Sequence, residues 1–320
     1  MTAAPSAPPA RYRGRFAPSP TGPLHFGSLI AAVASCADAR AAGGEWLLRI
    51  EDVDEPRTRA GAESVILAQL ERYGFAWDGP VLRQRDRIAR YAEALSQLRD
   101  GGHLYACACT RREQDDAPPG AGGERVYPGT CRDGIPADRR GRTQRAWRVR
   151  VPTGAAIAFV DRRQGAVEQD LARDVGDFVL RRADGLYAYQ LAVVVDDALS
   201  GVNAVVRGAD LLVSTPRQIL LQRMLDYVTP SYLHTPLAID QAGEKLSKQT
   251  RAAPLPDDAL PALVAAWRFL DQPWPGGSGA PDSVEAFWAH VRSAWTPARL
   301  PPVPMLPAPA AFAAGTPHGV

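Results

Sequence analysis

The stretch RFAPSPTGPLHFGS, residues 15–28, decides the fold of this chain. A short strand runs into a turn with two prolines before a glycine, and a helix then opens with His25 and Gly27. Backbone N–H groups and the dipole attract anions at a helix N-terminus, a histidine can donate to a phosphate oxygen, and a glycine lets a ligand approach the backbone. The turn therefore indicates a phosphate site. The alternative is a structural role, in which His25 caps the helix and Gly27 relieves a tight turn.

The composition is that of an ordinary globular protein. Hydrophobic residues make up 46% and charged residues 22% of the 320 residues, enough for one substantial core and a smaller module. A net charge of +2 permits nucleic-acid binding without demanding it. No apolar run approaches the ~18 residues that span a membrane, and the first residues lack a signal-peptide pattern. We expect a cytoplasmic, monomeric protein with no membrane partner.

Strand and helix patterns alternate along the chain. Strands are predicted at 14–18 and 45–54 and helices at 25–44, 61–74 and 86–102, an order that predicts an α/β fold with a parallel sheet. Later strands are predicted at 145–151 and 202–211, and residues 177–197 are predicted as two β runs joined by an Ala-Asp-Gly hairpin turn. Helices are predicted at 214–228, 260–270 and 283–295. Residues 301–320, rich in Pro and Ala, are predicted to be a disordered tail, like the leader at 1–12.

A second segment carries phosphate-binding chemistry. The loop DQAGEKLSKQT, residues 240–250, follows a short predicted strand and sets Lys245 and Lys248 around Ser247. Two point charges and a hydroxyl donor suit a triphosphate, although a lysine–serine loop taken alone is usually solvated surface. Two such segments near opposite ends of an α/β domain can close on one nucleotide.

Residues 107–141 form an insertion with little periodicity and much Gly, Pro and Arg. It contains Cys107, Cys109 and Cys131, and a reducing cytosol favours metal over disulfide. Three thiolates suit zinc, and on chemical grounds His103 or a water can be the fourth ligand. Cys36, on an Ala-rich helix face, is expected to be a core residue.

PSPTGPLHFGS and KLSKQ resemble the two signature motifs of class I aminoacyl-tRNA synthetases. With LLRIEDVDEPR and VVRGADLLVSTPRQ they are similar to the glutamyl-tRNA synthetase catalytic domain over residues 13–249. The resemblance implies a Rossmann-like parallel sheet with a small zinc-bearing insertion and a short helical C-terminal extension. Ser28 stands where the family has a second histidine, and Gln249 where its lysine motif ends in serine, so only His25 can take the family's histidine role. The implied order is 1–12 leader, 13–106 first catalytic half, 107–141 insertion, 142–250 second catalytic half, 251–300 helical extension and 301–320 tail.

The resemblance also implies the reaction and its residues. ATP, with Mg²⁺, would activate L-glutamate to glutamyl-adenylate by positioning and charge neutralisation. The residues implied for catalysis and ATP are His25, Gly27, Lys245, Ser247 and Lys248, of which His25, Gly27 and Lys248 bind ATP. Arg15, Tyr189 and Arg207 would contact the carboxylates of glutamate, Glu51 and Ser19 its ammonium group, beside the backbone of Phe16, Ala17 and Pro18. A structural Glu51–Arg15 ion pair is the plain alternative, and Asp196 and Asp197 are left outside the site, as polar contacts or turn residues.

The spacing C-x-C followed by Y-x-x-x-C resembles the zinc site of a shorter glutamyl-synthetase paralogue, in which a tyrosine oxygen completes the tetrahedron. It implies one structural Zn²⁺ held by Cys107, Cys109, Tyr127 and Cys131. The short chain after Gln249 and the KLSKQ ending resemble paralogues that activate glutamate without tRNA and pass it to the cyclopentenediol of queuosine in the anticodon of tRNA(Asp). The alternatives are a truncated synthetase that charges a tRNA 3′ end and a catalytically inactive synthetase-like RNA-binding protein. A run of arginines is available for phosphates: Arg139, Arg140, Arg142, Arg145, Arg148 and Arg150.

Overall fold

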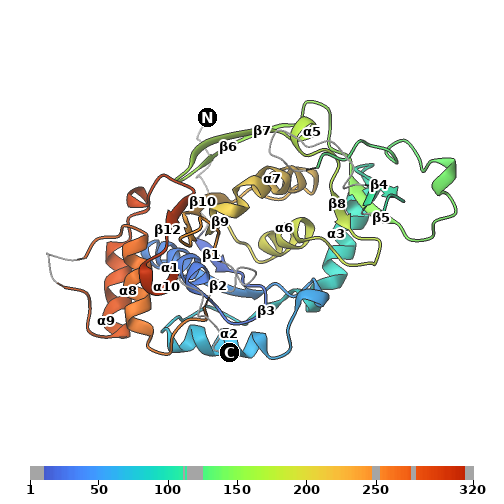
Figure 1. The fold of residues 1–320 in the computed structure, drawn as a ribbon. Coiled ribbons are helices and arrows are strands. Elements are labelled where there is room, and N and C mark those ends of the chain that lie inside the picture. Colours follow the sequence, from blue (N-terminus) through green and yellow to red (C-terminus); the bar gives the residue numbers. More distant parts are fainter. Residues whose placement is uncertain (1–10, 111, 114–124, 247–252, 275–278, 314–320) are drawn as a thin grey trace, which may run out of the picture.

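The computed structural model describes residues 11–110, 112–113, 125–246, 253–274 and 279–313. A parallel sheet and a mixed sheet meet in its centre (Figure 1). Strands β1 (Arg13–Phe16), β2 (Glu45–Ile50) and β3 (Leu82–Arg83) are parallel in that order. The second sheet has the order β7 (Gly165–Asp170), β6 (Ala156–Asp161), β10 (Ser231–Thr235) and β9 (Ala204–Gly208), with only the β6–β7 pair antiparallel.

Strand β1 lies alongside β9 and so joins the two sheets. The backbone N–H of Asn203 donates to the carbonyl of Arg13 at 3.1 Å, and the Arg13 N–H donates to Oδ1 of Asn203 at 2.8 Å. The carboxyl ends of β1, β2, β9 and β10 consequently share one edge, where an open α/β sheet binds ligands.

Helices cover both faces of this assembly. They are α1 (Phe26–Ala41), α2 (Ala62–Arg72), α3 (Ile88–Asp100), α5 (Leu171–Asp174), α6 (Tyr189–Leu199), α7 (Thr215–Met224), α8 (Ala259–Phe269), α9 (Val284–Ala294) and α10 (Ala310–Ala313). Short 3₁₀ turns lie at Glu55–Arg57, Gln84–Arg87, Ala137–Arg139, Ala209–Ser214 and Pro297–Arg299. No helix among the described residues combines the length and apolarity that a membrane crossing requires.

Two apolar cores lie on opposite faces of the strands. Val206 and Leu233 belong to the core with α1, α8 and α9, whereas their neighbours Val205 and Tyr232 belong to the core with α3, α6 and α7. Because successive strand residues point to opposite faces, this alternation shows that β9 and β10 are covered on both sides. The near-continuous apolar strands of the sequence follow from that burial.

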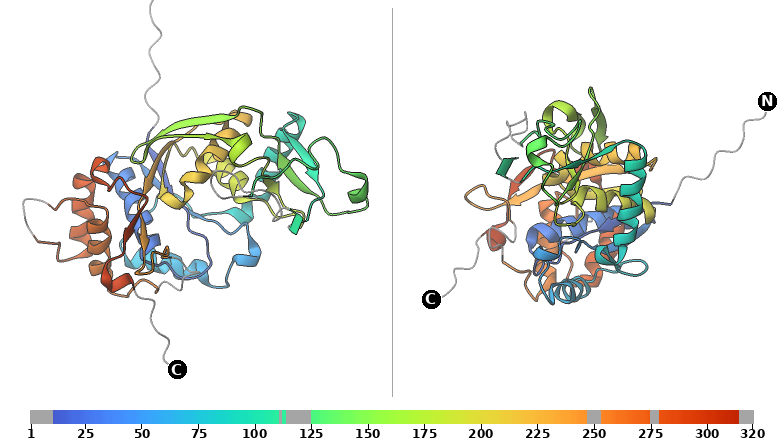
Figure 2. Two further views of the ribbon diagram at one scale, coloured as in Figure 1. Left: turned by 45° about the horizontal axis from the view of Figure 1, so that its top comes forward. Right: turned by 90° about the vertical axis from the view of Figure 1, so that its right-hand side faces the viewer.

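A small separate sheet flanks the cysteine-bearing insertion. Strands β4 (Leu104–Cys107), β5 (Ala146–Val149) and β8 (Val179–Arg181) are antiparallel in that order. In Figures 1 and 2 this sheet lies at one end of the molecule and the pair α8–α9 at the other. The catalytic sheet therefore lies between two appendages.

Two predictions are wrong. The run 188–197, predicted as the second half of a β hairpin, is mostly helix α6. The Ala-Asp-Gly turn itself closes a short hairpin, with an antiparallel bridge between Arg181 and Tyr187 and the Ala188 N–H donating to the carbonyl of Leu180 at 2.9 Å. The tail is not disordered as far as residue 313: β12 (Met305–Pro307) pairs with β11 (Leu237–Ile239) in parallel, and the ring of Phe312 stacks on Phe26 with centroids 4.2 Å apart. The predicted strands at 14–18 and 45–54, the three first helices and the helices at 214–228, 260–270 and 283–295 are confirmed within a few residues.

Candidate active site

A cavity of about 1080 Å³ opens at the shared edge of the strands. Its lining comes from the turn after β1, the end of β2, the start of α6 and the segments after β9 and β10. Nine residues predicted for the site line it: Phe16, Ala17, Pro18, Ser19, His25, Gly27, Glu51, Tyr189 and Lys245. Segments far apart in the sequence therefore supply one cavity, as the position of strand ends predicts.

The two segments predicted to bind phosphates meet in this cavity. His25 is the N-cap residue of α1, and Gly27 begins its first turn. A Cβ placed on Gly27 would lie 3.2 Å from the carbonyl oxygen of Leu246, so glycine permits the close approach of the lysine loop. Leu246 is held there by its own N–H, which donates to the carbonyl of Ala238 at 2.8 Å. Ser247, Lys248 and Gln249 lie outside the described residues.

Lys245 reaches across the cavity to a carboxylate. Its ammonium group is paired with Asp210, which also lines the cavity and follows β9. The side chains are 42% and 35% exposed, so the pair is open to competition from an anion in the cavity. Asp210 received no role from the sequence.

Arg15 and Arg207 lie directly behind the cavity wall. Both are almost fully buried, with 4% and 5% of their surface exposed, and neither is part of the lining. Nη1 of Arg207 donates to the phenol oxygen of Tyr189 at 3.5 Å. The two guanidiniums and Glu51 interact electrostatically with this phenol, whose pKa is raised chiefly by burial. Tyr189 therefore remains a neutral hydrogen-bond donor at the boundary between the buried charges and the cavity.

A buried charge network supports these residues. Arg15 pairs with Asp197 at 3.2 Å, and Arg49, 1% exposed, pairs with Asp197 at 2.5 Å and with Glu51 at 3.0 Å. The alternative of a direct Glu51–Arg15 pair is therefore replaced by three ion pairs that connect these residues through Arg49 and Asp197. Burial raises the pKa of Glu51 although Arg49 opposes it. Burial also opposes ionisation of Asp197, but Arg15 and Arg49 outweigh it and lower its pKa.

Sequence reasoning missed Arg49 and set Asp197 aside. A signal for Arg49 was available, because residues two apart on a strand share a face and Arg49 precedes Glu51 by two. Asp197 is eight residues after Tyr189, a spacing that shares a face in a strand and nearly does so in a helix, so the spacing alone did not assign it to the site. The adjacent Asp196 lies 3.8 Å from Nε of Arg49 and accepts hydrogen bonds from Gln84, Arg87 and Tyr91.

The predicted metal ligands converge in the insertion. The sulfur atoms of Cys107, Cys109 and Cys131 all lie within 4.8 Å of one another. The phenol oxygen of Tyr127 lies 3.3 Å from the sulfurs of both Cys107 and Cys109, and it accepts the Cys131 N–H at 2.9 Å. His103 is not among the clustered groups, since it precedes β4 and Cys107 ends it. Cys36 is buried in the core of α1, as predicted.

Two arginines of the basic run face this cluster. Nη1 of Arg139 donates to the sulfur of Cys109 at 2.9 Å, and the guanidinium of the buried Arg148 lies over the Tyr127 ring, 3.8 Å from its centroid. Burial opposes ionisation of Cys107, but the hydrogen bond from Tyr127 and the charge of Arg148 lower its pKa. Arg142 pairs with Glu113, so much of the run is engaged within the insertion. Contact of this run with phosphates stays a prediction.

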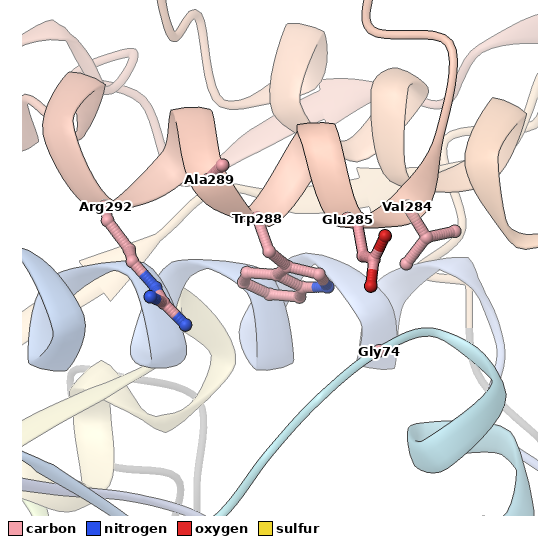
Figure 3. Close-up of a pocket in the computed structure, with 6 residues that line it drawn as sticks. All are labelled: Gly74, Val284, Glu285, Trp288, Ala289 and Arg292. Carbon is pink, nitrogen blue, oxygen red and sulfur yellow. The ribbon is translucent and has the colours of Figure 1, made fainter.

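A second, smaller cavity of about 250 Å³ lies at the other end of the molecule. Figure 3 shows Glu285 and Trp288 of α9 projecting toward the segment that carries Gly74, with Arg292 farther along the helix. It shares no lining residue with the first cavity. The His25 turn and Lys245 line the larger cavity, and the buried Arg15 and Arg207 lie behind its wall.

Comparison with known proteins gives consistent matches. The family model for tRNA synthetases class I (E and Q), catalytic domain, matches residues 11–258. The glutamyl-Q tRNA(Asp) synthetase of Dechloromonas aromatica is 59% identical over 293 residues, which are 89% of this chain and 94% of that protein. The protein of the same name from Thiobacillus denitrificans is 55% identical over 304 residues, 94% of this chain and 99% of its own.

Solved structures agree in fold. The glutamate-tRNA synthetase of Elizabethkingia anophelis gives a TM-score of 0.76 at 23% identity, covering 92% of this chain and 67% of the other. A glutamate tRNA ligase from Elizabethkingia meningosepticum in complex with its amino acid gives 0.73 at 25% identity, covering 91% and 66%. The chain thus spans about two thirds of these two structures.

Proposed function

We propose that this chain, which belongs to the class I tRNA synthetases for glutamate and glutamine, activates L-glutamate with ATP and transfers it to queuosine in the anticodon of tRNA(Asp). The observation that carries the proposal is the meeting of the His25 turn and the lysine loop at one cavity backed by buried arginines. Its volume of about 1080 Å³ suits a nucleotide with an amino acid beside it. Curated relatives of nearly the same length bear the name of this activity.

ATP would lie with its phosphates at the N-terminus of α1. His25 and the N–H groups around Gly27 supply donors there, and Lys245, Ser247 and Lys248 supply charge and a hydroxyl from the opposite side. When bound with ATP, Mg²⁺ would supply positive charge against the pyrophosphate leaving group. An oxygen of the glutamate α-carboxylate attacks the α-phosphorus, the bond to the bridging oxygen of the β-phosphate breaks, and pyrophosphate leaves. Positioning and charge neutralisation suffice for this step.

Glutamate would enter against Tyr189, in front of the buried cations. Arg15, Tyr189 and Arg207 would receive its carboxylates, and Glu51 with Ser19 its ammonium group. The backbone of Phe16, Ala17 and Pro18 lines the approach. Because Asp197 and Arg49 already fix Arg15 and Glu51, little reorganisation remains when the substrate binds.

Transfer of the glutamyl group to queuosine would take place in the same cavity. A hydroxyl oxygen of the queuosine cyclopentenediol attacks the glutamyl carbonyl carbon of the adenylate, an ester bond forms and AMP leaves with the electrons of its C–O bond. The hydroxyl proton is released in this step. The acceptor diol resembles a ribose cis-diol, so the carbonyl chemistry of ordinary aminoacylation applies to it.

The cysteine cluster fits one structural Zn²⁺. Cys107, Cys109 and Cys131 with the oxygen of Tyr127 provide four donors at short mutual distances. Three thiolates and a phenolate around Zn²⁺ carry two net negative charges, and two guanidiniums, of Arg139 and Arg148, lie against this donor set. The charge balance supports tyrosine rather than water as the fourth ligand. Bound zinc would fix the insertion, which has few apolar contacts of its own.

The test is acylation of tRNA(Asp) that contains or lacks queuosine, with glutamate labelled and ATP present. We expect label only on queuosine-containing tRNA, released with the anticodon fragment after ribonuclease digestion. Wild-type protein should also catalyse glutamate-dependent ATP–pyrophosphate exchange without tRNA. The variant His25→Ala should lose exchange, whereas Arg90→Ala, an exposed residue of α3, should retain it. Label on the 3′-terminal adenosine would instead identify ordinary charging and overturn the proposal.

A further inference from the structure

Arg207 is fixed in one orientation by groups behind the cavity wall. Its Nε donates to Nε2 of His234 at 3.1 Å, and its Nη2 donates to Oγ1 of Thr215 at 2.8 Å. Its Nη1 points toward Tyr189. The guanidinium therefore presents its Nη1 side to the site, and the other two nitrogens serve to hold it.

The partner of Nε has a defined protonation state. A guanidinium can only donate, so Nε2 of His234 must be the unprotonated nitrogen that accepts. Nδ1 then carries the proton and donates to Oδ2 of Asp161 at 2.6 Å. His234 is completely buried, and this burial lowers its pKa although Asp161 opposes the shift. The imidazole is therefore neutral, with one tautomer set by its two neighbours.

Asp161 is itself held by backbone. Its Oδ1 accepts the N–H groups of Arg163 and Gln164 at 2.9 and 2.8 Å in the turn between β6 and β7. The three residues of the relay lie at the carboxyl ends of three neighbouring strands, Asp161 on β6, His234 on β10 and Arg207 on β9, where His234 and Arg207 are paired in register. Rigid strands, not loops, thus set the direction of the guanidinium.

We propose that Asp161 and His234 are positioning residues that orient Arg207 toward the glutamate carboxylate and so determine the affinity for glutamate. This inference rests on the function proposed above, in which Arg207 receives a carboxylate. The relay contributes in two ways. The neutral imidazole holds Nε without competing charge, and its fixed tautomer forbids a rotated guanidinium that would point Nη1 away from Tyr189.

The tautomer provides a sharp test through Asp161→Asn. Three backbone N–H groups, those of His234, Arg163 and Gln164, favour the amide oxygen on the Oδ1 side. The amide N–H₂ then faces Nδ1 and donates to it, so the ring proton moves to Nε2 and meets the N–H of Arg207. A substitution that changes one atom at Asp161 should therefore displace a guanidinium two residues along the relay.

His234 allows a matched pair of substitutions. The oxygen of a glutamine side chain reaches the place of Nε2 and can still accept from Arg207, whereas asparagine reaches only the place of Nδ1. We expect His234→Asn and Asp161→Asn to raise KM for glutamate by roughly 10- to 100-fold, the effect of losing a hydrogen bond to a charged group. KM for ATP should stay unchanged, and His234→Gln should return KM for glutamate to within about threefold of wild type. His290→Gln on α9 is the matched control, because the ring of His290 bonds to the carbonyl of Pro273 and packs against Trp274, away from the larger cavity.

Two measurements complete the experiment. Glutamate-dependent exchange of the full chain gives both KM values, and ¹⁵N spectra of labelled histidine report the tautomer, with Nε2 unprotonated in wild type and protonated in Asp161→Asn. Thermal melts show which variants fold. A purely structural role would not separate His234→Gln from His234→Asn or KM for glutamate from KM for ATP. Two results would overturn the relay alone: asparagine variants that keep the wild-type KM for glutamate, or an active wild-type protein in which Nε2 of His234 is protonated. A wild-type protein without exchange would overturn the proposed function as well.

Discussion

Replacing Arg49 by methionine should destabilise the protein far more than the same change at an exposed ion pair. Arg49 is 1% exposed and is the cation shared by Glu51 and Asp197, at 3.0 and 2.5 Å. Methionine fills a similar volume, so the main loss is charge, which leaves two buried carboxylates facing Arg15 as their remaining nearby cation. Breaking a buried pair in this way costs about 3–5 kcal/mol.

The control is Arg90→Met, which removes an exposed pair with Glu93 at 3.0 Å. Such a pair contributes about 0.3–0.5 kcal/mol along a helix. Melts followed by circular dichroism should show a decrease in Tm of roughly 6–15 °C for Arg49→Met, at about 2–3 °C per kcal/mol, and of about 1 °C for the control. Equal decreases for the two variants would refute the reasoning.

The difference in stability between wild type and Arg49→Met should decrease as the pH falls. The pKa of Asp197 is lowered in the folded protein, so its contribution to stability is present above its unfolded value and is lost as pH falls through the folded value. Without Arg49 the pKa values of Asp197 and Glu51 rise, and protonation removes the uncompensated charge. The stability gap between wild type and Arg49→Met should narrow from pH 7 toward about pH 4. A gap that widens on acidification would contradict a charge origin.

Two further outcomes follow from other clusters. Arg139→Gln should weaken zinc binding by roughly 10- to 100-fold in chelator competition, because a charged donor to Cys109 is lost. The control Arg140→Gln should leave the zinc affinity unchanged. Equal zinc affinities of the two variants would contradict the proposed charge balance at the cluster. The carboxylate of Asp38 accepts the indole N–H of Trp295 at 2.8 Å and so holds the C-terminal extension. Arg162 lowers the pKa of Asp38 against the opposing effect of burial, so this contact is fully present above pH ~4 and is lost as pH falls through the lowered pKa. Tryptophan fluorescence should change only in that acidic range, and a transition near neutral pH would contradict this role.

Long amphipathic helices were predictable because their signals are local. The first helix after His25 ends near a Gly-Gly pair, and the helices at 61–74 and 86–102 repeat apolar residues at helical spacing. Helix α6 was not, because its centre Leu191–Val195 is continuously apolar and rich in valine. Periodicity cannot separate a fully buried helix from a fully buried strand in such a run, and β-branched residues favour the wrong choice. The pairing of Met305 with Leu237 depends on contacts 68 positions apart and left no local pattern.

The residues of the candidate site differ in the same way. Those within contiguous motifs, such as His25 and Gly27, could be placed at the cavity from the sequence. Arg49 and Asp197 could not, since what matters is which carboxylate each buried guanidinium meets after folding. His234 was equally hidden, because its role depends on strand register.

The ionised groups buried around Tyr189 have a consequence for which substrate the cavity binds. Arg15 and Arg49 each pair with a carboxylate, and the carboxylate of Asp161 lies behind the neutral imidazole of His234. The nitrogens of Arg207 itself contact neutral groups, those of His234, Thr215 and Tyr189 and the carbonyl of Leu211. In the proposed site the side-chain carboxylate of glutamate supplies an anionic partner for this guanidinium in a low-dielectric region, which the neutral amide of glutamine cannot do. Recognition of an acidic substrate would therefore depend on groups that the substrate does not touch, because they hold Arg207 without supplying an anion in direct contact with it.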